Sequence, residues 1–377
     1  MAPTAKRDTL TIGTCTSAPG QTTNGLLPAG TTPTRKPIYV PVTMVTGLRP
    51  GPVVGITAGV HGDEVSGMET VLRFLAELDP HQVAGTVVIA PVLNPTGYRH
   101  NQRNVFEDDT DLNRVFPGRK EGSTAEQVAF HLFEHLLRKL DFAIDIHDAG
   151  KLHSLLPHTR INVDDQDHCT SCTREMGLLY GTELVLERSG AAGMMAIEAR
   201  RLLRLPVLTV EVGGANNLRD HFIERGLRGL RNFLISQGML EGELELPEFQ
   251  FALKERTGIP APLSGIIRFH ANLGDGVAKG DVLADIRDPL TGRLETVEAP
   301  GTGVVFSRKM AARVEEGDSI GSVLEFEHSS THGAWPVDGE LIDNRQRNAR
   351  LYTSQVMEAA LRLISGRPQE VLRQAAE

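Results

Sequence analysis

Apolar and polar residues follow two different periods along residues 38–238, and the change of period predicts strands and helices in turn. Residues 53–60 (VVGITAGV) form a short run rich in Val, which is typical of a buried strand. Residues 64–78 then place apolar side chains at helical spacing. Because this alternation recurs, we expect an α/β domain built on a mixed, mainly parallel sheet with helical crossovers.

The expected elements follow one another closely along the chain. Strands are expected over residues 9–15, 38–45, 53–60, 86–94, 142–148, 182–187 and 205–214, and helices over 64–78, 123–140, 191–203 and 218–238. Ser123 with Glu126 predicts a capping box at the start of one of these helices. The stretches 17–37, 95–122 and 149–181 are expected to be irregular, and residues 239–256 to form a linker or a sheet edge.

Residues 257–328 contain an internal repeat. The segment 261–267 (APLSGII) recurs as 299–305 (APGTGVV), and 277–283 (VAKGDVL) recurs as 314–320 (VEEGDSI). Two copies of a short β unit predict a small all-β barrel or sandwich. The pattern resembles the biotinyl/lipoyl carrier fold, whose carriers bear a Lys on the hairpin between the halves. That hairpin, residues 287–299, contains no Lys, so we expect the fold without the modification.

These patterns divide the chain into three parts. We expect a catalytic α/β domain over residues 1–256, a small β domain over 257–335 and a C-terminal helical tail over 336–377, with its helix at about residues 348–364. A chain of 377 residues is long enough for two domains.

Composition narrows the function classes. A formal net charge of -9 argues against nucleic acid as a partner, because that binding depends on Lys and Arg at phosphates. The chain has no apolar run of signal-peptide or membrane-spanning length, which predicts a cytoplasmic protein without a membrane partner. Three cysteines are too few for a disulfide framework. Whether Cys169 and Cys172 bind metal stays open, as does association into a homo-oligomer.

Chemically useful side chains follow three of the expected strands. His61 and Glu64 stand at a strand-to-helix turn, and His147 closes the strand over residues 142–148. In open α/β sheets such groups converge at the carboxyl ends of the strands. Two His and one Glu are a ligand set of catalytic zinc, and they leave a fourth position for a water whose pKa falls toward about 7. The sequence therefore predicts one zinc ion per subunit.

Glu211 closes another strand and precedes two glycines, which allow a substrate to approach closely. A partly buried carboxylate near such a water accepts its proton and passes it to a leaving amine. Taken alone, Glu64 fits a helix N-terminus, His61 and His147 fit the core, and Glu211 fits an Arg pair. Their joint placement at strand ends favours the catalytic interpretation.

The charged loop 95–122 supplies candidate substrate contacts. Arg114, beside Asn113, offers a planar guanidinium suited to a carboxylate. Arg103 is placed to polarise a carbonyl and stabilise its oxyanion. The alternative is a loop tied down by Arg–Asp pairs.

Five motifs in fixed order resemble one family. HGDE (61–64), NP (94–95), DLNRVFPG (111–118), DIHDAG (145–150) and VEVGG (210–214) are similar to the succinylglutamate desuccinylase/aspartoacylase family of zinc amidohydrolases, relatives of the zinc carboxypeptidases. The resemblance implies a three-layer carboxypeptidase-like domain. It also implies zinc ligands at His61, Glu64 and His147, a catalytic acid/base at Glu211, a carbonyl-side arginine at Arg103, and a carboxylate grip at Asn113 and Arg114.

Residues 103–118 (RNVFEDDTDLNRVFPG) look more like the branch that deacetylates N-acetyl-diaminobutyrate. The resemblance thus implies a zinc-dependent amidohydrolase that removes an acyl group, acetyl by this likeness, from a small N-acyl amino acid. A zinc metallocarboxypeptidase acting on short peptides is the alternative enzyme. A non-catalytic binding module is the alternative from another class.

Overall fold

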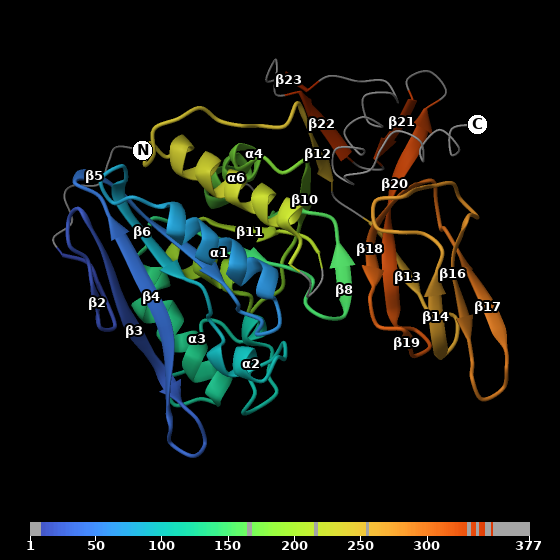
Figure 1. The fold of residues 1–377 in the computed structure, drawn as a ribbon, viewed down its shortest axis with the longest axis horizontal. Coiled ribbons are helices and arrows are strands. Elements are labelled where there is room, and N and C mark those ends of the chain that lie inside the picture. Colours follow the sequence, from blue (N-terminus) through green and yellow to red (C-terminus); the bar gives the residue numbers. More distant parts are fainter. Residues whose placement is uncertain are drawn as a thin grey trace.

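The centre of the molecule is a mixed β-sheet (Figure 1). This computed structural model describes residues 9–163, 168–214, 218–253, 256–329, 333–336, 339–343 and 348–349. The strands of the sheet, in spatial order, are β23 (Asn348–Ala349), β22 (Gly339–Asp343), β12 (Phe249–Leu253), β10 (Leu184–Arg188), β9 (His158–Asn162), β11 (Val207–Glu211), β7 (Phe142–His147), β5 (Arg49–Ala58), β6 (Ala84–Ala90), β4 (Pro37–Thr46) and β3 (Gln21–Thr31).

Two parallel blocks of strands meet in the middle of this sheet. β11, β7, β5 and β6 are parallel to one another, and so are β9, β10 and β12. β9 runs antiparallel to β11, with His158 opposite Glu211. The expected α/β fold with a large, mainly parallel sheet is confirmed for these central strands. The meeting of the two blocks places the start of β9 beside the end of β11.

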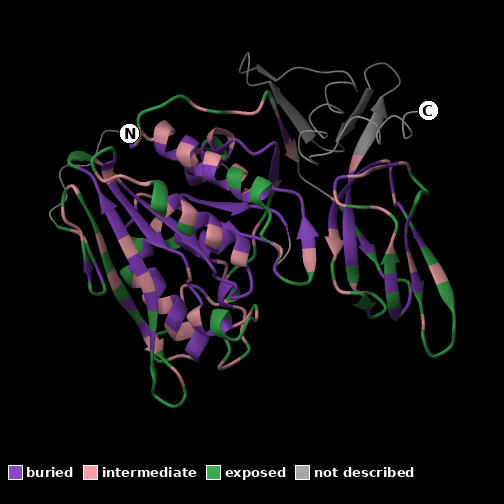
Figure 2. Ribbon diagram, in the orientation of Figure 1, coloured by how far each residue is buried: buried purple, intermediate pink, exposed green. Residues whose placement is uncertain are grey.

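Helices cover both faces of the sheet, so the architecture has three layers. One face packs against α1 (Val65–Glu77), α4 (His168–Tyr180) and α6 (Asp220–Ser236). The other packs against α3 (Thr124–His135), η2 (Leu137–Lys139), α5 (Met195–Glu198) and η3 (Ala199–Leu203). Figure 2 shows the central strands buried between these layers. The expected capping box of Ser123 and Glu126 begins α3.

The loop 95–122 is irregular as expected, apart from the short α2 (Pro95–Arg99) and η1 (Leu112–Arg114). No helix among the described residues is long and apolar enough to cross a membrane.

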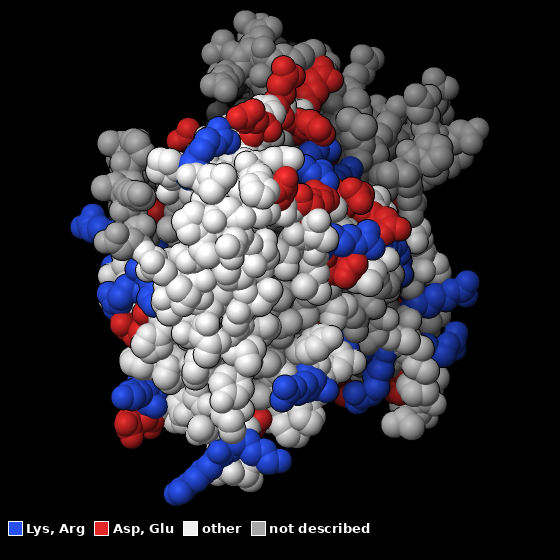
Figure 3. Space-filling model, turned by 60° about the vertical axis from the view of Figure 1, so that its left-hand side comes forward, with Lys and Arg blue, Asp and Glu red and all other residues white. Residues whose placement is uncertain are grey.

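The irregular stretch expected over residues 17–37 is wrong, because most of it forms the edge strand β3. The preceding strand expected over residues 9–15 is instead a hairpin of β1 (Thr11–Ile12) and β2 (Cys15–Thr16). This hairpin packs so closely on β3 that a Cβ on Gly25 would lie 2.3 Å from the Cys15 backbone nitrogen. Gly25 therefore permits the close approach of two backbones within a strand. β3 and β4 contain no charged residue, and the uncharged face in Figure 3 lies on their side.

The irregular segment expected over residues 149–181 is also wrong. It contains β8 (His153–Leu155), β9 and most of α4. The sequence pattern did not predict β9, because its side chains are polar. His158 and Thr159 are nevertheless fully buried, since hydrogen bonds satisfy their polar atoms. Residues 239–256 contain β12, which lies inside the sheet between β10 and β22.

Two antiparallel sheets form from residues 257–329. One contains β13 (Thr257–Pro260), β20 (Ser319–Ser329), β18 (Gly303–Lys309) and β15 (Gly276–Val277); the other contains β17 (Leu294–Glu298), β16 (Val282–Arg287), β14 (Gly265–Phe269) and β19 (Arg313–Val314). The repeat is visible in the pairing, since β14 pairs with β16 and β19 as β18 pairs with β20 and β15. These strands share their own apolar core.

This β region pairs with strands that precede and follow it in the sequence. β8 pairs with β18, and β21 (Gly333–Pro336) pairs with β20. Of the helix expected over residues 348–364, the structure describes only the first two residues, which form β23; the rest lies outside the described residues. The division at residues 256 and 335, the biotinyl/lipoyl likeness and the carboxypeptidase likeness stay predictions.

Helices α4 and α6 approach each other closely at Gly229. A Cβ there would lie 2.1 Å from the nearest ring carbon of Tyr180, whose hydroxyl donates to the Gly226 carbonyl at 3.0 Å. We expect Gly229→Ala to destabilise the fold, because overpacking costs about 1–3 kcal/mol and outweighs a helix-propensity gain of up to about 1 kcal/mol. The measurement is the thermal unfolding midpoint, which should fall by several degrees.

Gly258→Ala is the matched control, because a Cβ there has no heavy atom within 4 Å. Its midpoint should stay at the wild-type value. A Gly229→Ala midpoint at or above that of the wild type would contradict the close packing of α4 on α6.

Candidate metal centre and active site

Three buried side chains from the ends of two adjacent strands form the candidate metal centre. His61 and Glu64 lie in the turn after β5, and His147 is the last residue of β7. Nδ1 of His61 lies 2.6 Å from Glu64 Oε1, and Nδ1 of His147 lies 2.9 Å from Glu64 Oε2. One ligand atom from each residue lies within 4.8 Å of the others. The structure thus brings together the three side chains that the sequence predicted.

The turn is held in place by close backbone contact. A Cβ on Gly62 would lie 2.1 Å from the carbonyl carbon of Gly97, so this position requires glycine. The Gly62 amide also donates to the carbonyl of Arg103 at 3.1 Å. The contact fixes the turn against the loop that carries the candidate substrate residues.

A second ring of carboxylates orients the two imidazoles. Nε2 of His61 lies 3.1 Å from Asp111 Oδ1, and Nε2 of His147 lies 2.7 Å from Asp145 Oδ2. Metal-binding histidines commonly donate their other ring nitrogen to a carboxylate, which fixes the tautomer. The arrangement therefore marks Nδ1 of each ring as the ligand atom.

Charge in the cluster fits a cation. Burial alone lowers the pKa of His61 and of His147, yet the neighbouring carboxylates raise both pKa values above the ordinary range. Burial alone raises the pKa of Glu64, but the two imidazoles bring it well below its usual value. Three carboxylates thus enclose two imidazoles, and this donor set of two nitrogens and one carboxylate fits zinc.

Arg103 lies at the edge of this cluster. Its Nη1 lies 3.2 Å from Glu64 Oε1, and its Nη2 lies 3.3 Å from Asp111 Oδ2. Its side chain is 47% exposed, so the guanidinium borders the cavity. The Arg–Asp pair expected if the loop is only tied down by such pairs is therefore present. The Arg103 guanidinium also faces the cavity that could hold a substrate.

Asn113 and Arg114 line the same cavity from η1. Asn113 is buried, and its Oδ1 accepts the Met195 amide at 2.8 Å, which ties η1 to the start of α5. Nη1 of Arg114 donates to the Asn113 carbonyl at 2.7 Å. The two residues are thus held side by side at the cavity wall.

Glu211 faces the cavity from the end of β11. Its Oε1 lies 2.9 Å from Nη2 of Arg160. Its Oε2 is buried and has no hydrogen-bond partner among the described residues. A buried carboxylate oxygen that lacks a partner among the described residues, in a cavity shared with a candidate metal cluster, is suited to act as a general base.

The cavity has a volume of about 320 Å³. It is lined by all seven predicted site residues and by Asp148, Ala149, His153, Leu155, Arg160, Met194, Thr209, Arg256, Ser307 and Ser319. Ser307 and Ser319 belong to β18 and β20, so the β region supplies part of the wall. A cavity of this size suits a small molecule.

Sequence reasoning missed two cationic lining residues. Arg160 lies in β9, inside a segment expected to be irregular, and Arg256 lies just before β13. Burial, together with Arg160 and Arg188, lowers the pKa of Arg256 to about 10. Its guanidinium lies 5.2 Å from the centre of the Phe306 ring. Only the pairing of β9 with β11, which the sequence pattern does not show, would have pointed to Arg160.

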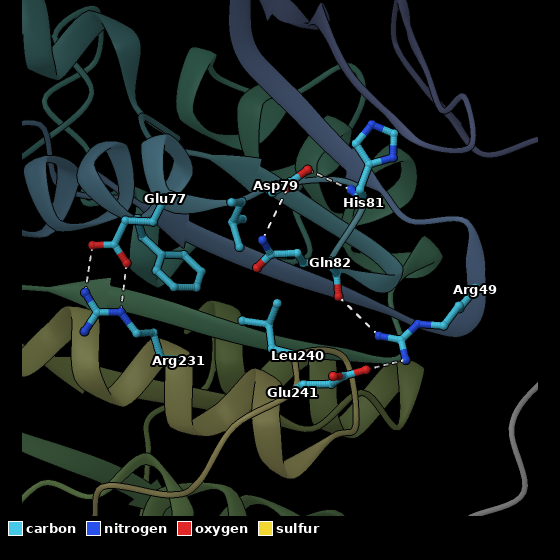
Figure 4. A pocket seen from close by; sticks show the side chains of 10 residues that line it. Arg49, Glu77, Asp79, His81, Gln82, Arg231, Leu240 and Glu241 are labelled. Atoms are coloured by element: carbon cyan, nitrogen blue, oxygen red, sulfur yellow. Dashed lines mark hydrogen bonds and ion pairs between the residues drawn. The ribbon is translucent and has the colours of Figure 1, made fainter.

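A larger cavity, of about 640 Å³, lies at the amino-terminal ends of β5 and β6, away from the candidate metal centre (Figure 4). Four of its charged groups form ion pairs: Arg231 with Glu77 at 2.8 Å and Arg49 with Glu241 at 3.1 Å. Among the described residues, the His61, Glu64 and His147 group is the one set able to hold a metal, and this cavity lacks it. The smaller cavity is therefore the candidate active site.

Comparison with known proteins agrees with the motifs. Residues 50–236 match the model of the succinylglutamate desuccinylase/aspartoacylase catalytic domain. The chain is 28% identical over 298 residues to N-alpha-acetyl-L-2,4-diaminobutyric acid deacetylase of Halomonas elongata, covering 76% of this chain and 86% of the relative.

Solved structures show the same fold. A succinylglutamate desuccinylase from Silicibacter sp. TM1040 superposes with a TM-score of 0.73 and 24% identity, covering 80% of this chain and 94% of that one. The product-bound ectoine utilization protein EutE from Ruegeria pomeroyi gives a TM-score of 0.73 and 26% identity, with the same coverage of 80% and 94%. Residues 50–236 therefore form a catalytic domain of the succinylglutamate desuccinylase/aspartoacylase family, and the protein is a hydrolase of amide bonds.

Proposed function

We propose that the protein is a zinc-dependent deacylase that removes an acyl group, acetyl in our proposal, from a small N-acyl amino acid. The observation that carries this proposal is that one small cavity holds both the metal-capable cluster and Glu211, whose Oε2 has no hydrogen-bond partner among the described residues. The name of the Halomonas elongata relative supports acetyl as the acyl group. The cytoplasmic location, self-association and the absence of nucleic-acid partners stay predictions from the sequence.

His61, Glu64 and His147 would hold one zinc ion, which supplies Lewis acidity and a nucleophile at neutral pH. Asp111 and Asp145 keep the two imidazoles in the tautomer that presents Nδ1. The burial of all three ligands excludes bulk water and strengthens the electrostatic interactions at the centre.

Glu211 moves the proton in this proposal. Its Oε2 accepts a proton as the water oxygen bonds to the acyl carbon, and it returns that proton to the amide nitrogen as the C–N bond breaks. The products are a carboxylic acid and a free amine. Oε1 stays paired with Arg160, so one oxygen of the carboxylate is available to the reaction.

The loop residues bind and orient the substrate. Arg114, with Asn113, would grip the carboxylate of the amino acid, since a guanidinium forms two parallel hydrogen bonds to a carboxylate. Arg103 would stabilise the charge that develops on the carbonyl oxygen. Its contacts with Glu64 and Asp111 keep the guanidinium beside the metal ligands.

A metallocarboxypeptidase would use the same ligands and the same base. The small cavity volume and the wall formed by Ser307 and Ser319 favour a small substrate over a peptide. We expect the zinc-loaded protein to hydrolyse N-acetyl amino acids and to leave tripeptides intact. A chromatographic assay of N-acyl amino acids, with acyl group and side chain varied separately, measures this; faster cleavage of tripeptides would establish the carboxypeptidase instead.

Replacement of the proposed base tests the mechanism. Glu211→Gln should reduce kcat by about 10²–10⁴-fold, because the amide cannot accept the proton. Its zinc content, measured by elemental analysis, should equal that of the wild type, since Glu211 is not among the grouped ligand atoms. A near-normal rate in this variant would remove Glu211 from the reaction.

Replacement of Arg114 tests the carboxylate grip. Arg114→Ala should raise KM by about 10–100-fold for N-acetyl amino acids, since a hydrogen bond to a charged group contributes about 1.5–3 kcal/mol. The matched amino-acid amides, which lack the carboxylate, should be nearly unaffected. An equal loss on both substrate sets would exclude this role.

A further inference from the structure

A continuous series of side-chain contacts lies next to Glu211. The antiparallel pairing of β9 with β11 sets His158 opposite Glu211 and Arg160 opposite Thr209. Because side chains two residues apart in a strand point to the same face, His158 and Arg160 lie side by side next to the carboxylate. The pairing therefore brings a histidine, an arginine and the proposed base into one row.

His158 orients Arg160. The ring is fully buried, and its Nδ1 lies 2.9 Å from the carbonyl oxygen of Leu156, which can only accept a hydrogen bond. Nδ1 therefore carries the proton and Nε2 is the acceptor. Nε of Arg160 donates to this Nε2 at 3.3 Å. Burial and the charge of Arg160 hold the pKa of His158 well below its ordinary value, which keeps the ring neutral and able to accept.

Arg160 in turn holds one oxygen of Glu211. Its Nε is taken by His158, while its Nη2 lies 2.9 Å from Glu211 Oε1. A planar guanidinium bound at two of its nitrogens has little freedom to rotate. Oε1 is thereby committed, and Oε2 is left as the carboxylate oxygen without a partner among the described residues.

The β region supports the other end of this row. Phe306 of β18 is buried, its ring centre lies 5.0 Å from that of His158, and its carbonyl accepts the Leu156 amide at 3.0 Å. Leu156 is the residue whose carbonyl fixes the His158 ring. The contacts thus run from β18 through His158 and Arg160 to Glu211.

We propose that Arg160, held by His158, is a positioning residue that aims Oε2 of Glu211 at the reacting atoms. This inference rests on the proposed deacylase function. In this proposal, the orientation of Glu211 is fixed by His158 and Arg160 of β9, and the C-terminal β region supports these two side chains.

The positioning role differs from substrate binding in what it predicts. If Arg160 aims the base, its loss lowers kcat and leaves KM nearly unchanged, because the substrate still binds but the proton acceptor is misplaced. If Arg160 grips the substrate, its loss raises KM. Misplacement of a catalytic group by about 1 Å costs about 10²-fold in rate.

The experiment compares Arg160→Gln with Arg188→Gln by steady-state kinetics on the best N-acyl amino acid found. Arg188 is an exposed residue at the end of β10 that shares the electrostatic environment of Arg160 and Arg256. We expect Arg160→Gln to lower kcat about 100-fold with KM within about twofold, and Arg188→Gln to match the wild type. Guanidinium ion added to Arg160→Ala should restore part of kcat.

Two variants of His158 test the row if Arg160 variants fail to fold. His158→Gln retains an oxygen acceptor for Arg160, whereas His158→Phe retains an aromatic ring on Phe306 without an acceptor. We expect kcat to fall about 10-fold or more in His158→Phe and to recover largely in His158→Gln, with zinc content and thermal midpoint as controls.

A rise of KM at constant kcat in Arg160→Gln would overturn the proposal in favour of substrate binding. The proposal would also be overturned if kcat in Arg160→Gln, His158→Gln and His158→Phe equalled the wild-type value, as is expected of the Arg188→Gln control. Crystal structures of the wild type and Arg160→Gln separate this inference from the deacylase function. The Glu211 carboxylate should change its orientation in the variant whether or not any N-acyl amino acid is hydrolysed. An unchanged orientation would contradict the proposal that Arg160 positions Glu211.

Discussion

The carboxylate of Glu64 between two imidazoles is the interaction on which the candidate site depends. Each of its oxygens faces one Nδ1, so the buried charge is shared between His61 and His147. A buried carboxylate is unfavourable unless it is paired, and here the pairing links the ends of β5 and β7. Asp111 and Asp145 enclose the pair from outside. A positive ion at Nδ1 of both rings would offset this concentration of negative charge, which is the physical basis of the zinc proposal.

The antiparallel contact between β9 and β11 provides the other half of the site. Strands β5, β7 and β11 carry the candidate metal ligands and the proposed base at or just after their carboxyl ends, where α/β sheets commonly form their sites. β9 runs the other way and brings His158 and Arg160 to that same edge. The β region then closes the cavity with Ser307 and Ser319 and packs Phe306 behind His158. Two parts of the chain with separate cores thus share one site.

The candidate metal ligands could be predicted from the sequence because His61 and Glu64 closely follow a strand with a plain apolar pattern and His147 ends another. The same reasoning failed for β9, since its residues His158, Thr159 and Arg160 are polar and their burial depends on partners elsewhere in the chain. It failed for β3 because the close packing of the β1–β2 hairpin requires glycine at position 25, whereas glycine in a sequence more often indicates a turn or loop. The local sequence pattern predicts a buried strand only where the buried residues are apolar. It does not predict strands whose buried residues are polar and hydrogen-bonded.

The sequence by itself determined the α/β class, the repeated β region, the seven candidate site residues and the family resemblance. Each of these depends on order and periodicity along the chain, which a sequence contains in full. Only the tertiary structure decided which strand lies beside β11, that Arg160 pairs with Glu211, and that the β region forms part of the cavity wall. These features depend on strand order and on contacts between residues that are distant in the sequence. A sheet pairs segments that lie far apart along the chain, and the local pattern of each segment does not show which strand will be its neighbour.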